Sequence, residues 1–253
     1  MERTLRSYLW PALGYLIVLE AMLAAACLFW PSFRDNVESL KAMAPMASLR
    51  QMVDALAQGG VEAYVNGQHF FKGCNTLGTA AAVLFAMNAV AGEANRGTME
   101  LWLSRPFTRR RLLLERYVAG ALALTVPIFL SSLTVPWLLS FVDERMDIAG
   151  LMLCSAHQSL FLLALYSATF LLSTLSSRPV WIAMAMLFFT TLEFSLYLVK
   201  TVTHWSIFRL TDIEALIWIM QHRALDWTRC LPMVATSVVL LVAAERSFAR
   251  RVV

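Results

Sequence analysis

Hydrophobic and charged residues are segregated into long blocks along this chain. Six apolar blocks stand between charged segments, and about 17–25 apolar residues are enough for a helix to cross the hydrocarbon core of a bilayer. The pattern therefore predicts an all-α polytopic membrane protein with six transmembrane helices. We expect spans at 8–30, 70–92, 117–141, 151–175, 180–199 and 230–244, the last of which is short.

Composition narrows the class of protein. Hydrophobic residues make up 59% and charged residues 15% of the 253 residues, and the mean hydropathy is +0.63. A soluble domain is about 45–50% apolar and about 25% charged, so an ordinary water-soluble enzyme is excluded, as is a disordered chain. No internal repeat or low-complexity linker divides the sequence. We expect one transmembrane domain over residues 1–253.

The basic residues predict an orientation, because segments rich in lysine and arginine stay in the cytoplasm. With a cytoplasmic N-terminus, the inner segments are 1–7, 93–116, 176–179 and 245–253. They carry 12 of the 21 basic residues over 44 positions, whereas the outer segments, together with Lys72, carry the other 9 over 78 loop positions. This density predicts that both termini are cytoplasmic.

Two segments on the expected outer side predict amphipathic helices. Each begins with a capping box, Ser48 with Gln51 in one and Thr211 with Glu214 in the other. Apolar residues recur at helical spacing in the turns that follow. These helices would lie at the outer membrane interface or pack on the bundle.

The inner segment 93–116 carries the most specific pattern. Thr98 follows a glycine and is a suitable N-cap, and Glu100 is favoured in the first turn after it. Apolar residues that include Trp102 then share one helical face, and Pro106 ends the helix because proline has no amide hydrogen. We predict a short amphipathic helix on the inner membrane face, which enters either the lipid headgroups or the groove of a partner.

This segment resembles the signature of type-2 ATP-binding-cassette (ABC) permeases. The shared pattern is Glu-x-x-x-Gly-Thr-x-Glu-x-x-Leu-Ser-x-Pro-x-x-Arg, and Arg116 stands where the family often has lysine. The chain is most similar to short six-span permeases like that of the nitrous oxide reductase maturation system. In such permeases this segment forms the coupling helix, which docks into a separate nucleotide-binding subunit. The resemblance assigns partner coupling to Glu93, Gly97, Thr98, Glu100, Trp102, Pro106 and Arg109.

The resemblance also implies partners and a location. It implies an exporter in a bacterial inner membrane, built from two permease copies, as a homodimer or heterodimer, and separate ABC ATPase subunits that bind ATP and Mg. The substrate stays open, and a periplasmic partner on which the complex does mechanical work is an alternative to transport. A non-transporting membrane scaffold or assembly factor is the alternative function.

The chain has no nucleotide-binding or catalytic motif of its own. Residues 73–79 have the glycine spacing of a phosphate-binding loop but lack its lysine, so we expect the ATPase on another chain. We predict no catalytic residue, cofactor or metal site here, because the histidines are scattered and the methionines fit packing. Cys74, Cys154 and Cys230 fall near outer helix ends, where either a disulfide or buried free thiols would fit.

Three polar residues are candidates for a pathway. Glu20 and Glu193 lie inside apolar blocks, where an ionisable group costs at least about 2.5 kcal/mol on insertion scales. Such a carboxyl group either lines a conduit or bonds to a neighbouring helix. Asn88 lies near Glu93 in sequence and would extend a polar inner mouth.

Overall fold

The computed structural model describes residues 2–44, 47–99, 108–199 and 201–250, and over these residues the chain is helical with no strand. The helices are α1 (Glu2–Asp35), α2 (Val37–Met43), α3 (Ala47–Gln58), α4 (Gly60–Asn66), the π-helix η1 (Gly67–Gly78), α5 (Thr79–Met87), α6 (Ala91–Asn95), α8 (Arg109–Ser140), α9 (Ile148–Leu175), α10 (Pro179–Leu198), the short 3-10 turns η2 (Thr203–Trp205) and η3 (Ile207–Thr211), α11 (Ile213–His222) and α12 (Trp227–Arg250).

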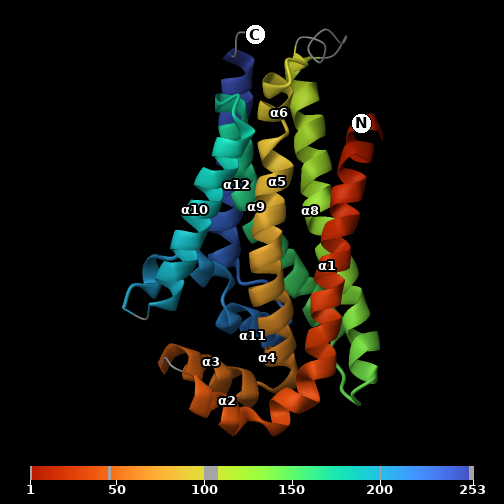
Figure 1. Cartoon of the computed structure of the whole chain (residues 1–253), viewed down its shortest axis with the longest axis vertical. Coiled ribbons are helices and arrows are strands. Elements are labelled where there is room, and N and C mark those ends of the chain that lie inside the picture. The colour runs from red at the N-terminus through yellow and green to blue at the C-terminus, as the bar shows by residue number, and fades with distance from the viewer. Residues whose placement is uncertain (1, 45–46, 100–107, 200, 251–253) are drawn as a thin grey trace.

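Six helical stretches among the described residues are long and apolar enough to cross a membrane. This confirms the predicted fold class of an all-α, multi-pass integral membrane protein. The stretches are Arg6–Asp35, Gly60–Met87, Arg109–Ser140, Ile148–Leu175, Pro179–Leu198 and Trp227–Arg250. They run along the long axis of the bundle, and α6 lies at the same end as the start of α1 and the end of α12 (Figure 1). We call this the loop end, and the end that carries α2, α3 and α11 the cap end.

The helical stretches differ from the predicted span boundaries: the first ends at Asp35 where 30 was expected, the third begins at Arg109 where 117 was expected, and the second and sixth differ as follows. The second stretch starts at Gly60 and ends at Met87, where 70–92 was expected. It ends early because the Ser173 hydroxyl of α9 accepts bonds from the amides of Val90 (3.0 Å) and Ala91 (2.9 Å) and donates to the Met87 carbonyl (3.0 Å). These bonds satisfy the backbone groups that a helix break leaves free. The sixth helix covers Trp227–Arg250, well beyond 230–244.

The two amphipathic segments form α3 and α11 at the cap end. The N-cap of α11 is Asp212, not the predicted Thr211. The Asp212 carboxylate accepts a hydrogen bond from the Ala215 amide at 2.8 Å. The Thr211 hydroxyl instead donates to the side chain of Gln158 at 2.6 Å, so it ties the start of α11 to α9.

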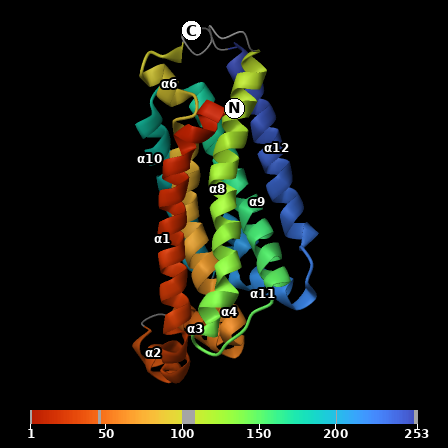
Figure 2. The ribbon, with the colours of Figure 1, turned by 90° about the vertical axis from the view of Figure 1, so that its right-hand side faces the viewer.

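Helix α9 packs against α5, α8 and α12 and forms the centre of the bundle. Figure 2 shows α8 standing between α1 and α12 on one side, with α9 beside it. Gly120 lets α8 approach α9, because a Cβ atom there would lie 2.2 Å from the Tyr166 hydroxyl oxygen. Tyr166 is fully buried, and its hydroxyl donates to the Tyr117 carbonyl at 3.2 Å.

The Gly120→Ala variant is expected to be less stable than the wild type, because the added methyl group displaces a rigid, buried ring. Overpacking of this kind costs about 1–3 kcal/mol. Thermal unfolding of the detergent-solubilised protein measures the loss. The control is Gly14→Ala on α1, where the new methyl group meets nothing within 4 Å. Equal unfolding temperatures for the two variants would contradict this account of the α8–α9 contact.

Buried polar side chains link the second span to its neighbours. Gln158 of α9 donates to Asn75 Oδ1 of η1 at 2.6 Å and accepts from Thr211. Nearer the cap end, His69 bonds to the Ser132 hydroxyl at 3.2 Å, and the Ser155 hydroxyl donates to Ser132 at 2.8 Å. The segment 73–79 is therefore part of a buried helix and not a loop that could hold a phosphate.

The sequence left two alternatives for the cysteines, a disulfide or buried free thiols, and the structure has free thiols. The four cysteines, Cys27, Cys74, Cys154 and Cys230, are all buried free thiols. Cys230 instead lies 3.4 Å from the His157 ring nitrogen Nδ1, and it packs inside the bundle near the start of α12.

Candidate functional site

The candidate site begins where α6 ends. Gly97 has a φ of +68°, in the left-handed region that favours glycine. The Gly97 amide donates to the Ala94 carbonyl (3.2 Å) and the Thr98 amide to the Glu93 carbonyl (3.1 Å), which is the hydrogen-bond pattern of a Schellman C-cap. Gly97 thus turns the chain back over α6 and brings Thr98 onto Glu93.

Glu93 is the centre of this site. Its carboxylate accepts a hydrogen bond from Arg116 of α8 at 2.6 Å and pairs with Arg96 at 3.3 Å. The Thr98 hydroxyl donates to the other carboxylate oxygen, and Arg116 also donates to the Ala89 carbonyl at 3.1 Å. One carboxylate therefore joins α6, the turn after it and α8.

The electrostatics of the site favour an ionised Glu93. Its side chain and that of Arg116 are 14% and 18% exposed, so water screens their pairing only in part. Burial raises the pKa of Glu93, but the Thr98 hydroxyl and the Arg116 and Arg96 guanidinium groups together hold that pKa below its ordinary value of 4.5. The link is therefore a charged one at neutral pH.

The structure places only some of the predicted coupling residues. Glu93, Gly97 and Thr98 come together as described. Arg109 is the first residue of α8, is exposed, and follows the N-cap Thr108. Glu100, Trp102 and Pro106 lie outside the described residues, so their coupling roles and the short helix predicted there stay predictions.

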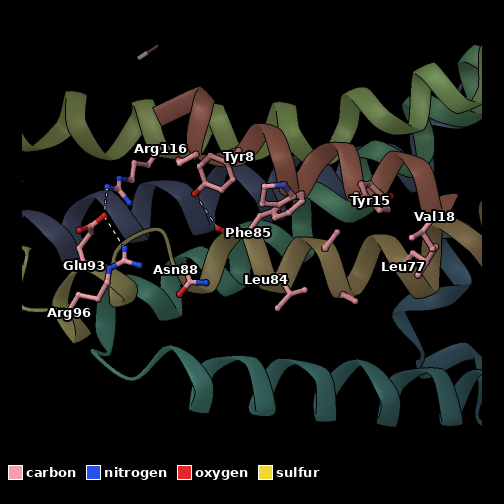
Figure 3. Close-up of a pocket in the computed structure, with 15 residues that line it drawn as sticks. Tyr8, Tyr15, Val18, Leu77, Leu84, Phe85, Asn88, Glu93, Arg96 and Arg116 are labelled. Carbon is pink, nitrogen blue, oxygen red and sulfur yellow. Dashed lines mark hydrogen bonds and ion pairs between the residues drawn. The ribbon is translucent and has the colours of Figure 1, made fainter. Parts of the chain in front are cut away.

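A groove of about 740 Å³ opens beside this site, between α1 and the α5–α6 segment. Figure 3 shows Glu93 between Arg116 and Arg96 at one end of it, with Asn88 and Tyr8 next along the groove. The Tyr8 hydroxyl donates to the Phe85 carbonyl at 3.2 Å. Farther from the charged end, the walls are apolar and include Val18, Leu77 and Leu84.

The three pathway candidates are not brought together. Asn88 lines the groove with Glu93, but Glu20 lies on α1 and Glu193 on α10, which stand on opposite sides of the bundle in Figure 1. The Glu193 carboxylate accepts a hydrogen bond from the Ile207 amide at 3.0 Å. The backbone carbonyl of Glu193 accepts one from the Ser206 hydroxyl at 2.7 Å. Glu193 thus anchors the segment that leads to α11, which favours the hydrogen-bonding interpretation over a conduit.

Sequence reasoning missed the role of Arg116 as the partner of Glu93. The family pattern marked the position as basic, and that was the available signal. Tyr8, on the first helix, and Arg96 were also missed as members of the same groove. Arg96 is three residues after Glu93, so its spacing was a signal for the pair. The places of Arg116 and Tyr8 depend instead on how α1, α6 and α8 pack, which the local spacing of residues does not encode.

Two comparisons with known proteins bear on this geometry. A search of curated proteins finds no match. The family model described as "ABC-2 family transporter protein" matches residues 3–252. The matched residues include all six spans and both residues of the Glu93–Arg116 link. Because the match covers nearly the whole chain, this protein belongs to the ABC-2 transporter family.

Proposed function

We propose that this chain, the transmembrane component of an ABC transporter and not itself the ATPase, is the permease subunit of an ATP-driven exporter. Segment 93–116 lies in the cytoplasm and docks on a separate ATPase subunit, and two permease copies enclose the pathway. The export direction and the bacterial inner membrane follow from the resemblance to type-2 permeases. The similarity to the nitrous oxide reductase maturation permease stays a prediction.

The observation that supports coupling is the Glu93–Arg116 link. Force applied to a loop moves transmembrane helices only if the loop is tied to them. Glu93 ties α6 to α8 through Arg116, and Ser173 ties the start of α6 to α9. An ATPase that grips the loop differently in its two states can shift the helices by that difference in docking free energy.

The charge at the loop end supports the cytoplasmic placement. Arg96, Arg110 and Arg111 have side chains that are 59%, 70% and 61% exposed, and Arg178 and Arg250 are exposed at the same end. Arginine-rich ends of transmembrane helices stay on the cytoplasmic side.

The test is to purify the protein from its native membrane in mild detergent and identify ATPases that co-purify. We expect an ABC ATPase in stoichiometric amount. The Arg109→Glu variant should lose most of this ATPase, since it reverses a charge at the start of α8 within the docking segment. The control is Arg178→Glu, the same reversal at the same end of the bundle, and it should retain the ATPase. If neither the wild type nor Arg178→Glu retained an ATPase, the scaffold alternative would replace this proposal.

A further inference from the structure

The groove between α1 and α5 lies beside the coupling segment, and it also has the features of a ligand site. Its volume of about 740 Å³ lies within the range of about 300–1,000 Å³ that is usual for small-molecule sites. One end is polar and charged, whereas the walls beyond it are apolar. A ligand that fits both parts is amphiphilic.

The charged end selects an anion. The carboxylate of Glu93 faces two guanidinium groups, those of Arg96 and Arg116, so this end of the groove carries a net positive charge. Arg96 contacts Glu93 only at 3.3 Å and its side chain is 59% exposed. Its guanidinium can therefore receive a phosphate group without breaking the shorter Glu93–Arg116 contact.

The tyrosines of α1 differ in what they offer to an occupant of the groove. The Tyr8 hydroxyl donates to the Phe85 carbonyl at 3.2 Å. Tyr15 lines the groove, but its hydroxyl oxygen is buried on the inner side, 3.0 Å from where a Cβ atom of Gly78 would lie. The polar contacts available to an occupant are therefore those of the charged end and of Asn88.

The surroundings of the groove indicate where the occupant comes from. Val18 and Leu84, which line the groove, are 48% and 50% exposed, and Ile17 next to them is 66% exposed. Apolar side chains exposed at this level of a membrane-spanning bundle face hydrocarbon. The groove is therefore accessible to a molecule that is already in the bilayer.

From these features we propose that the groove binds one anionic phospholipid, with its phosphate on Arg96 and an acyl chain between α1 and α5. The ester carbonyls below its headgroup are hydrogen-bond acceptors, and the side-chain amide of Asn88, which lines the same groove, is a donor for them. The assignment of this lipid to the cytoplasmic leaflet rests on the orientation given in the proposed function, whereas the binding itself does not.

Native mass spectrometry of the delipidated protein, incubated with an equimolar mixture of phosphatidylglycerol and phosphatidylcholine, tests the proposal. The wild type is expected to retain one phosphatidylglycerol. Arg96→Gln should reduce that retention about fivefold, because one basic contact with an anionic lipid is worth about 1 kcal/mol. Ala80→Phe, which fills the groove, should abolish it.

Matched controls separate the groove from the rest of the surface. Arg178→Gln removes an exposed arginine at the same end, and Ala185→Phe adds a ring to an exposed position on α10. Both should retain the lipid like the wild type. Unfolding temperatures near that of the wild type verify that Ala80→Phe and Arg96→Gln are folded.

Four results would overturn the proposal. They are equal retention of phosphatidylcholine, displacement of the lipid by inorganic phosphate alone, equal losses in Arg178→Gln, and disulfide crosslinking of lipid-free Leu84→Cys copies through the groove. The last would show that a second copy covers the groove. None of them bears on whether an ATPase co-purifies, so this proposal and the proposed function fail separately.

Discussion

The Glu93→Gln variant is expected to insert into the membrane normally and to lose about 90% of its coupled activity. The amide keeps the shape of the carboxylate but removes the charge that holds Arg116 and Arg96. Hydrogen bonds to charged groups contribute about 1.5–3 kcal/mol, and this pair is partly exposed, so we take the lower figure. About 1.4 kcal/mol corresponds to a tenfold change.

The measurement is stimulation of the partner ATPase by the reconstituted permease, together with transport once a substrate is known. Glu38→Gln is the control, because the Glu38 side chain is 87% exposed and pairs with Lys41 of the same helix, α2, at the cap end. Arg116→Gln alone should resemble Glu93→Gln, and the double variant should be no worse than either single one. Additive losses in the double variant, or wild-type coupling in Glu93→Gln, would show that this link does not transmit force.

Acid should reproduce the effect of the substitution. Because the pKa of Glu93 is lowered in the folded protein, its ionised form contributes stability that is fully present above pH 4.5 and is lost as the pH falls through the lowered value. The difference in unfolding temperature between wild type and Glu93→Gln should therefore be constant near neutral pH and shrink below pH 4.5. A difference that grew with acidity would contradict the assignment.

The Gln158→Leu variant is expected to be clearly less stable than the wild type. Leucine has a similar volume but leaves Asn75 Oδ1 and the Thr211 hydroxyl without the partners that Gln158 gives them. Hydrogen bonds between membrane helices average about 0.6 kcal/mol and reach about 1.7 kcal/mol. Two short bonds lost from one buried side chain therefore cost about 2 kcal/mol.

Unfolding temperature and yield of monodisperse protein in detergent measure this loss. The control is the neighbouring residue, Ser159, whose buried hydroxyl has no partner among the described residues. Ser159→Ala removes that group and should leave stability unchanged or slightly raised. If Gln158→Leu were as stable as Ser159→Ala, the polar contacts of α9 would be incidental to the fold.

The sequence was a good guide to the number of spans and to the position of the segment that follows the second one, because both are encoded in contiguous residues. It misplaced the second span because hydropathy measures suitability for lipid, whereas Asn66 and His69 lie in protein. It extended the same span through Val90 because it could not foresee that Ser173, on another helix, would satisfy the amides at the break.

The candidate site likewise combines features encoded by neighbouring residues with features that depend on helix packing. The contacts of Gly97 and Thr98 in the structure are local, with Ala94 and Glu93, whereas their coupling role stays a prediction. The partnership of Glu93 with Arg116 depends on how α6 and α8 pack, and the groove depends on α1 as well. Only a three-dimensional arrangement could reveal them.

The make-up of the second span has a consequence for how the protein is produced. It is the least apolar of the six described stretches, and 67% of its most apolar part is buried in protein. A newly synthesised chain that had emerged only as far as α5 would expose Asn66, His69 and Asn75 to lipid, at a cost that its apolar residues barely offset. We therefore expect stable integration of this segment to follow the synthesis of α8 and α9. Until then, the nascent chain is expected to depend on the insertion machinery and to be open to membrane proteases.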